Sequence, residues 1–222
     1  MAKRSEAAGK ERVPLSRERV LRAALALADA GGLEALSMRQ LGRALGVEAM
    51  SIYNHVSNKD DILAGLVDII AGKIEMPEGA GDWKEAMRKR AISMRRTFKR
   101  HPWALGLLES RQSVGPSALR YFDSVLGVLR RAGFSARMAL RAFSVLDSYA
   151  YGFVIQEKSL PSGSASEARR STELFLRQLP PNEHPHLAEI AGKVALRSGF
   201  DFAKEFEFGL DLILEALDRS RG

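Results

Sequence analysis

One short segment, Ala49 to Leu63 (AMSIYNHVSNKDDIL), concentrates side chains that could bind a polar partner. It places an aromatic ring, an amide and an imidazole in a row at Tyr53, Asn54 and His55, shortly after a Gly-Val step. A catalytic segment would need partner groups, yet the chain has no Ser/His/Asp grouping, P-loop, dinucleotide fingerprint or HExxH motif. We therefore expect a binding function and not an enzyme.

The composition of the 222-residue chain excludes several classes of protein. There is no cysteine, so disulfides, thiolate metal sites and cysteine nucleophiles are excluded. No apolar run reaches the roughly 18 residues that suggest a membrane-spanning helix. The charged N-terminus lacks the apolar core of a secretory signal. We expect a cytoplasmic protein that has no membrane contact, cofactor or metal.

The net charge of +7 is unevenly distributed. Residues 84–141 hold fourteen Lys/Arg and three Asp/Glu, whereas residues 1–59 hold ten and six. Basic proteins often bind nucleic acid, but here the strongest positive field lies in the middle of the chain. The basic run at 88–100 could be a solvated helix face, could attract an acidic ligand, or could add a long-range field that helps association.

The elements that position the 49–63 segment are predicted to be helices, because helical periodicity dominates and no strand pattern is convincing. The Pro- and Gly-containing stretch 75–83 divides the chain into a flexible basic arm at 1–15, a three-helix head at 16–74 and a larger helical domain at 82–222. This predicts an all-α protein. The expected helices span 16–30, 37–45, 49–55, a fourth from about 58, one after 83, and then 103–110, 116–132, 135–157, 167–178, 186–197 and 201–219.

The head has the pattern of a helix-turn-helix motif, in which a short Gly-containing turn joins two helices. Ser37 and Gln40 have the spacing of a capping box, and Gly46 suits a left-handed turn position. Val47 and Ile52 would anchor the 49–55 helix, leaving its other residues facing outward. In such motifs the second helix enters the major groove of DNA.

These residues resemble a known family. LEALSMRQLGRALGVEAMSIYNHVSNKDDIL is similar to the DNA-binding head of TetR-type transcriptional repressors. FDSVLGVLRRAGFSARMALRAFSVLDSYAYGFVIQEK and FEFGLDLILEALD resemble the ligand-binding and dimerisation domain of the tetracycline-repressor subclass. The resemblance implies a homodimer that binds double-stranded, palindromic operator DNA and responds to a small-molecule effector.

The resemblance also implies roles for individual residues of the head. Arg39 would reach a base or a phosphate, and Lys59 would bind a phosphate near a helix N-terminus. Glu48 departs from the family, which commonly has Ser or Thr there. Each side chain could instead be ordinary surface or packing. The implied DNA-binding residues are Arg39, Ala49, Met50, Ser51, Tyr53, Asn54, His55 and Lys59.

The last helix has an apolar arc too wide for one covering face, which favours a partner subunit. The resemblance implies that this helix and the one at 135–157 pair across a two-fold axis. Gly152, inside that long helix, lowers helix propensity by about 1 kcal/mol against Ala and is best explained by close helix approach. The expected interface residues are Phe143, Ala150, Gly152, Phe202, Phe206, Leu210, Ile213 and Leu217.

Aromatic and methionine side chains with a few polar tips could line an effector pocket in the larger domain. Each could equally be a core residue. Tetracycline itself is not expected, because Ser148 and Gln156 stand where the tetracycline repressor has metal-binding positions. EHPH (183–186) could bind a metal, but a surface loop is preferred. The pocket candidates are Met87, Met94, Phe98, His101, Trp103, Leu107, Tyr121, Tyr149 and Phe153.

The sequence thus predicts a homodimeric, sequence-specific transcriptional regulator that a small molecule releases from its operator. The alternative is a small-molecule-binding protein whose head does not read DNA specifically, and Glu48 is the feature in its favour.

Overall fold

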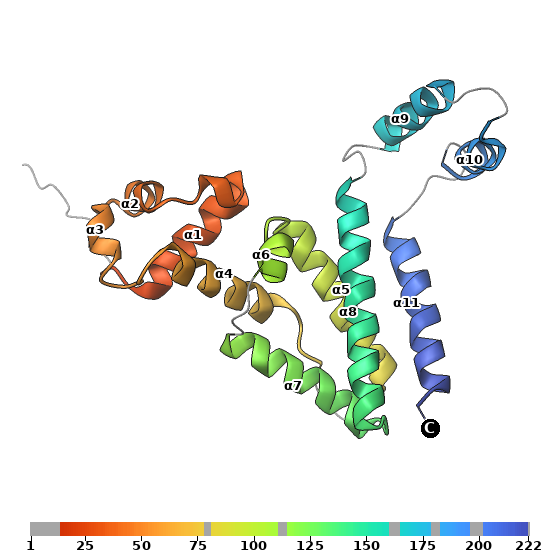
Figure 1. The fold of residues 1–222 in the computed structure, drawn as a ribbon, viewed down its shortest axis with the longest axis horizontal. Helices are drawn as coiled ribbons and strands as arrows, with labels where there is room; N and C mark the ends of the chain where they lie inside the picture. The colour runs from red at the N-terminus through yellow and green to blue at the C-terminus, as the bar shows by residue number, and fades with distance from the viewer. Residues whose placement is uncertain are drawn as a thin grey trace, which may run out of the picture.

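The computed structural model describes residues 14–77, 81–110, 115–159, 165–178, 183–195 and 202–221, and these contain helices and no strand (Figure 1). The all-α prediction is therefore confirmed, while most of the predicted basic arm lies outside the described residues. The elements are α1 (Arg17–Gly31), η1 (Leu33–Ala35), α2 (Met38–Leu45), α3 (Ala49–Ile52), α4 (Lys59–Lys73), α5 (Trp83–Arg100), α6 (Ala104–Ser110), α7 (Pro116–Arg131), α8 (Ala136–Ser159), α9 (Ala165–Gln178), α10 (Pro185–Ile190), η2 (Ala191–Ala195) and α11 (Phe202–Arg219).

Short polar side chains fix the beginnings of the head helices. The Ser16 hydroxyl accepts a hydrogen bond from the Arg19 amide at 3.2 Å, and the Ser37 hydroxyl accepts one from the Gln40 amide at 3.2 Å. The Asn58 side chain accepts from the Asp61 amide at 2.8 Å. Each contact satisfies an amide that has no partner within its own helix. The predicted starts near 16, 37 and 58 are confirmed.

The third helix is shorter than the sequence predicted. It ends at Ile52 instead of His55, and residues 53–55 continue as turns. The Tyr53 amide donates to the Met50 carbonyl at 3.2 Å and the His55 amide to the Ile52 carbonyl at 2.9 Å. These three-residue spacings tighten the chain relative to an α-helix. The segment has only seven residues. Its hydrophobic pattern is therefore too short to distinguish successive tight turns from an α-helix.

Two hydrophobic clusters organise the molecule, one in the head and one in the larger body. The head cluster joins α1, α2, α3 and the first half of α4, and the body cluster joins α5, α7, α8 and α11. Helix α6 contributes to both, with Leu107 in the head cluster and Leu105 in the body cluster. Helix α4 belongs to both, because Leu66 lies in the head cluster and Ile70 in the body cluster. Figure 1 shows α4 as the helix that runs from head to body.

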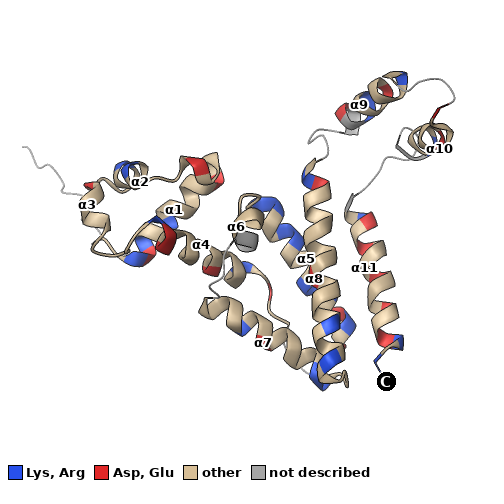
Figure 2. Ribbon diagram, viewed as in Figure 1, with Lys and Arg blue, Asp and Glu red and all other residues tan. Residues whose placement is uncertain are grey.

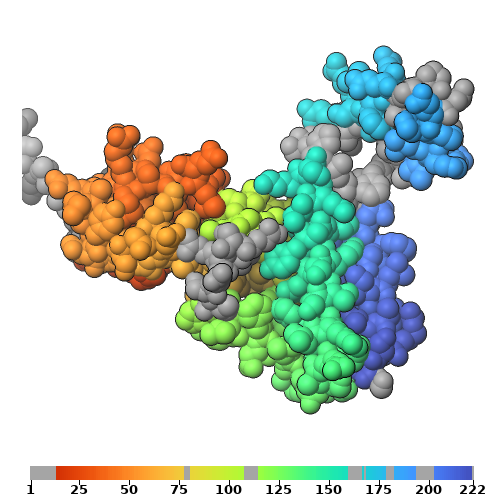
Figure 3. Space-filling model, in the orientation of Figure 1, coloured from red at the N-terminus to blue at the C-terminus, as the bar shows by residue number. Residues whose placement is uncertain are grey.

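The long helices of the body pack side by side, whereas α9 and α10 stand apart. Helix α11 lies along α8 and buries Phe206, Leu210 and Leu214 against it. Helices α9 and α10 project from the end of α8, beyond the body (Figure 3). Leu174 and Phe175 on α9 are exposed. The head projects from the opposite side of the body.

Candidate nucleic-acid interface and ligand-binding domain

The turn between α2 and α3 holds the two helices close together. Gly46 adopts a left-handed conformation with φ of 68°, as its position in the sequence predicted. The Val47 amide donates to the Gly42 carbonyl at 3.0 Å, so the chain folds back immediately after α2. Ile52 is fully buried in the head cluster and anchors α3. The opposite side of α3 is therefore left facing outward.

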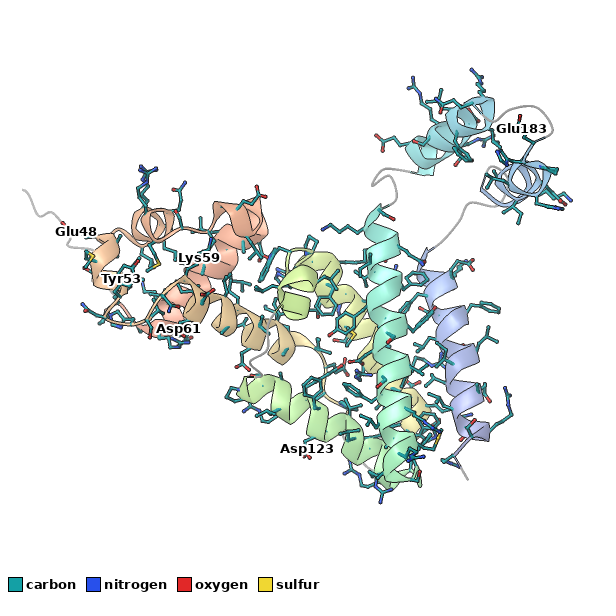
Figure 4. The ribbon with its side chains drawn as sticks, in the orientation of Figure 1. Glu48, Tyr53, Lys59, Asp61, Asp123 and Glu183 are labelled. Atoms are coloured by element: carbon teal, nitrogen blue, oxygen red, sulfur yellow. The ribbon has the colours of Figure 1, made fainter. Side chains whose placement is uncertain are left out.

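The outward side of α3 and of the turn that follows it carries side chains that were selected from the sequence. Met50 is 72% exposed, Tyr53 and Asn54 are exposed, and His55 is half-buried. Figure 4 shows Glu48 and Tyr53 at the end of the head farthest from the body. Of the other selected residues, Arg39 in the first turn of α2 and Lys59 at the start of α4 are exposed, and Ala49 and Ser51 are half-buried.

An ion pair fixes the start of α4, where Lys59 stands. The Asp61 carboxylate accepts two hydrogen bonds from the Arg17 guanidinium of α1, at 2.8 and 2.6 Å, and one from the Ser57 amide at 2.9 Å. The Arg17 bonds, followed by the Ser57 bond, lower the pKa of Asp61 to about 2. The carboxylate is therefore ionised at neutral pH and holds the N-terminal turn of α4, a suitable place for a phosphate, against α1.

Glu48 occupies the position before α3 without capping it. The side chain makes no capping hydrogen bond, whereas its backbone carbonyl accepts from the Ser51 amide at 3.0 Å. The carboxylate is exposed at the outer tip of the head. It would meet the edge of any duplex that α3 enters.

The structure disperses the nine pocket candidates over three environments. Leu107 belongs to the head cluster. Trp103 packs against both clusters and His101 is bonded to the head. The six candidates within the body cluster or packed against it are Met87, Met94, Phe98, Tyr121, Tyr149 and Phe153.

A pocket of about 640 Å³ lies on the segment that joins α4 to α5. It is lined by Arg90 and by charged residues that include Lys73, Glu75 and Glu85, but by none of the nine candidates. Sequence reasoning missed this pocket, because it selected aromatic and methionine side chains that fill the core, whereas the pocket is lined by the segment that joins α4 to α5.

One of the three interpretations of the basic run at 88–100 was a solvated helix face, and the structure excludes it for Arg90. The side chain is 1% exposed; its Nε donates to the Tyr121 hydroxyl at 2.6 Å and its Nη2 donates to the Asp147 carboxylate. Burial raises the pKa of Tyr121 well above its usual value, so it stays a neutral phenol. One signal could have revealed the pair: Asp147 is the single acid within the apolar stretch from 138 to 156.

Most of the other cations on α5 are paired with carboxylates, although Lys89 and Lys99 are also exposed. Arg95 donates to Glu157 of α8 at 2.9 and 2.7 Å, Lys99 reaches the same carboxylate at 2.7 Å, and Arg88 pairs with Asp211 of α11. The basic run at 88–100 therefore joins α5 to α8 and α11. Figure 2 shows the basic and acidic residues along these three helices.

His101 and Trp103 contact the head through one carboxylate. Asp29 of α1 accepts from the Trp103 indole Nε1 at 2.8 Å, and its Oδ1 lies 2.6 Å from His101 Nδ1. His101 is 2% exposed, and its Nε2 has no hydrogen-bond partner within the part of the chain that the structure describes. Their sequence positions suggested a pocket, but the structure places both side chains at the junction of head and body.

The expected interface residues divide between the core and the surface. Ala150, Phe206, Leu210 and Leu217 are buried within the chain, so they have little surface to offer a partner. Phe143 and Ile213 are half-buried against the same core, and the Phe202 side chain lies outside the described residues. The apolar arc of α11 is wide because one side packs on α8 of the same chain. The exposed apolar residues of α8 and α11 are instead Leu140, Val145, Ile155, Phe208 and Leu212.

Two features are absent from the part of the chain that the structure describes. No three His, Cys, Asp or Glu side chains of that part of the chain are grouped as metal ligands would be. None of its helices has the length and apolarity to cross a membrane.

Comparison with known proteins matches both halves of the chain to families. Residues 20–66 match the model of bacterial regulatory proteins of the tetR family, and residues 77–220 match the tetracyclin repressor-like C-terminal domain. The HTH-type transcriptional repressor DrrR1 of Streptomyces coeruleorubidus is 31% identical over 209 residues, which cover 92% of this chain and 77% of that protein. The Escherichia coli tetracycline repressor protein class C is 29% identical, covering 93% of this chain and 92% of the repressor.

A solved structure shares the fold over almost the whole chain. The Streptomyces coelicolor TetR family protein ActR, in complex with actinorhodin, aligns with a TM-score of 0.78 and 29% identity. The alignment covers 95% of this chain and 100% of ActR. The similarity thus includes the body as well as the head.

Proposed function

This chain belongs to the tetR family of bacterial transcriptional regulators, and from that premise we propose that it is a homodimeric repressor that a small organic molecule releases from a palindromic operator. The observation that carries the proposal is the exposed surface of α3 and of the turn that follows it, where Met50, Tyr53 and Asn54 lie on either side of the buried anchor Ile52. Helix α3 would lie in the major groove, with Arg39 at its flank.

The proposed contacts divide into base readers and phosphate binders. Met50 offers an apolar tip to a thymine methyl, and Arg39 can donate two hydrogen bonds to guanine. Tyr53, His55 and Lys59 would hold the phosphate backbone and so fix the register of the head. The ion pair that anchors the first turn of α4 supports the role of Lys59, because it fixes that helix N-terminus beside the groove.

We place the dimer interface on the exposed apolar sides of α8 and α11. Phe208 and Leu212 are one helical turn apart on α11 and are 65% and 57% exposed. On α8, Gly152 and Ile155 share a face, and among the described residues a Cβ at Gly152 would meet no atom within 4 Å beyond the backbone of its own helix. A glycine with open space beside an exposed apolar stripe suits the close approach of a second chain. This retains the helix pair predicted from the sequence, but assigns other residues to the contact.

The effector site is proposed to lie in the body. ActR was solved in complex with actinorhodin, and DrrR1 and the tetracycline repressor are named as repressors. Those names support a small organic effector. The 640 Å³ pocket has apolar residues and charged ones, including Lys73 and Lys89, in its lining, which would favour an organic ligand that carries hydrogen-bonding or acidic groups. Assembly on DNA places the protein in the bacterial cytoplasm.

One observation favours a second function. Glu48 presents a carboxylate at the tip of the head, where phosphates would repel it. A head that had lost specific DNA binding would leave a small-molecule-binding protein.

Selection of bound duplexes from a random pool tests the proposal. We expect one palindrome, bound by two chains. Recovery of no motif would contradict the proposed function and favour the binding-protein alternative.

A further inference from the structure

The head is attached to the body at a second place besides α4. Helix α4 carries the main connection, with Leu66 in one cluster and Ile70 in the other. Apolar contacts support this connection, because Leu107 of α6 is buried in the head cluster and Leu25 of α1 packs against the body cluster. Apolar contacts are non-directional, so they fix rotation of the head about α4 less strictly than hydrogen bonds do. The contact of Asp29 with His101 and Trp103 lies off that axis, because it joins α1 to the segment between α5 and α6.

The chemistry of this second attachment is well defined. An ionised carboxylate only accepts hydrogen bonds, so the proton in its contact with His101 lies on Nδ1 of the imidazole. Trp103 Nε1 can only donate, and it donates to the same oxygen at 2.8 Å. Two donors from the body thus converge on one acceptor from the head. Hydrogen bonds to an ionised acceptor are about twice as strong as those between neutral groups.

The donors are held rigidly by the body. His101 directly follows α5 and is buried, its amide donating to the Thr97 carbonyl at 3.0 Å. Trp103 directly precedes α6 and packs against both hydrophobic clusters. The two rings make an edge contact with centroids 6.1 Å apart. A shift of α1 relative to α5 and α6 would therefore lengthen both hydrogen bonds.

We propose that Asp29 is a positioning residue for operator binding: it fixes the rotation of the head about α4 and thereby sets the separation of the two reading helices in the dimer. The inference rests on the proposed function. Asp29 need not touch DNA to act in this way. Its effect would appear in how strictly the dimer requires one spacing between half-sites.

The loss of affinity on changing the half-site spacing distinguishes the two roles that Asp29 could have. This loss would not change if Asp29 only stabilised the fold. Two half-sites one helical turn apart are separated by about 34–36 Å, so one added base pair moves a half-site by about 3.4 Å and turns it by about a tenth of a turn. A dimer with fixed heads should lose much affinity for such a duplex. A dimer whose heads rotate more freely should lose less, although it binds the correct spacing more weakly.

The experiment compares Asp29→Ala, Trp103→Phe and the double variant with the wild-type full chain. The probes are the duplex selected from a random pool, the same duplex with one base pair added or removed at its centre, and an unrelated duplex. Trp103→Phe removes the indole donor and keeps an aromatic ring. Glu34→Ala, an exposed acid on η1, is the control for removing one negative charge from the head.

We expect Asp29→Ala to bind the selected duplex at least about fivefold more weakly than the Glu34→Ala control. The penalty for one added base pair should shrink in the same variant. Trp103→Phe should change both quantities in the same direction, and the double variant should bind no more weakly than Asp29→Ala. That non-additivity would identify the two side chains as one unit.

Two results would overturn the inference. The first is an unchanged affinity and an unchanged spacing penalty in both single variants. The second is an equal loss on every duplex, the unrelated one included, because it would indicate damage to the fold. A wild-type protein that binds no selected duplex would instead contradict the proposed function itself.

Discussion

Gly42 and Val47 approach each other so closely that no larger residue fits between α2 and α3. The Val47 amide donates to the Gly42 carbonyl at 3.0 Å, and a Cβ on Gly42 would lie 2.8 Å from the carbonyl oxygen of Val47. The obstacle is backbone, which cannot swing aside as a side chain can. The position of α3 on the head therefore depends on this glycine.

We expect Gly42→Ala to destabilise the head by about 1–3 kcal/mol, as overpacking does, and to weaken operator binding. Gly72→Ala in α4 is the matched control, because its Cβ would meet nothing nearer than 3.6 Å and alanine favours the helix. Urea unfolding and anisotropy titration with the selected duplex measure the two effects. Equal, small effects of both substitutions would show that the contact does not constrain α3.

Arg39→Ala should relax the base preference at one position of the half-site and reduce operator affinity by about 1–3 kcal/mol. The reason is the loss of the paired donors that distinguish guanine from other bases. Arg43→Ala, an exposed arginine one turn further along α2, is the control and should leave the preference intact. Repeating the duplex selection with each variant provides the measurement. An unchanged preference in Arg39→Ala would remove it from the base readers.

Lys59→Ala should weaken binding to all duplexes about equally and lower the slope of log affinity against log salt by about 1. Without this phosphate contact, binding releases one counterion fewer from the DNA. The loss does not depend on sequence, because a phosphate contact does not distinguish one base from another. Lys73→Ala, at the opposite end of α4, should leave the slope unchanged. A loss confined to one sequence would mean that Lys59 reads bases.

Asp147→Asn should lower the free energy of unfolding by about 3–5 kcal/mol, because Arg90 would keep its charge in a buried site without a counterion. Asp211→Asn breaks the pair that Arg88 makes from the same helix, at the surface, and should cost about 1 kcal/mol or less. Thermal and urea unfolding of both variants test the contrast. Similar losses in the two variants would contradict the importance assigned to burial.

Asp61 predicts a defined sensitivity to acid. Its pKa is lowered from 3.8 to about 2 in the folded state, so the stability it supplies is present above pH 3.8 and is lost as the pH falls toward 2. Because Arg17 and Asp61 are partly exposed, we expect about 1 kcal/mol from this pair.

Asp61→Asn should therefore be less stable than the wild type at neutral pH, and the difference should shrink at about pH 2.5. Urea unfolding at the two pH values, with Asp60→Asn as the neighbouring control, measures it. A difference that is the same at both pH values would show that the pair does not titrate as described.

Local features of the fold could be predicted from the sequence, and long-range ones could not. Ser16, Ser37 and Gly46 mark helix ends through contacts within four residues, so their neighbours in the sequence are enough to identify them. Arg90 and Asp147 meet across 57 residues, and Asp29 and His101 across 72. Periodicity places each on a helix face but says nothing of which face another helix will cover.

The same limit explains the reassigned interface. The apolar stripe of α11 that includes Phe206 and Leu210 was predicted to contact a second chain, and it covers α8 of the same chain instead. A wide apolar arc indicates that two surfaces pack against the helix. It does not indicate which of the two belongs to the same chain. The residues of α3 were easier to select, because a short helix with one buried anchor leaves few positions free.

The most direct test of the central claim is the ratio of affinities for the selected operator and for a shuffled duplex of the same composition, measured at physiological salt. Specific binding by a dimer through α3 predicts a ratio of about 10³ or more, together with a stoichiometry of two chains per duplex. A ratio near one, or binding that disappears on both duplexes together as salt rises, would show that the head does not read sequence.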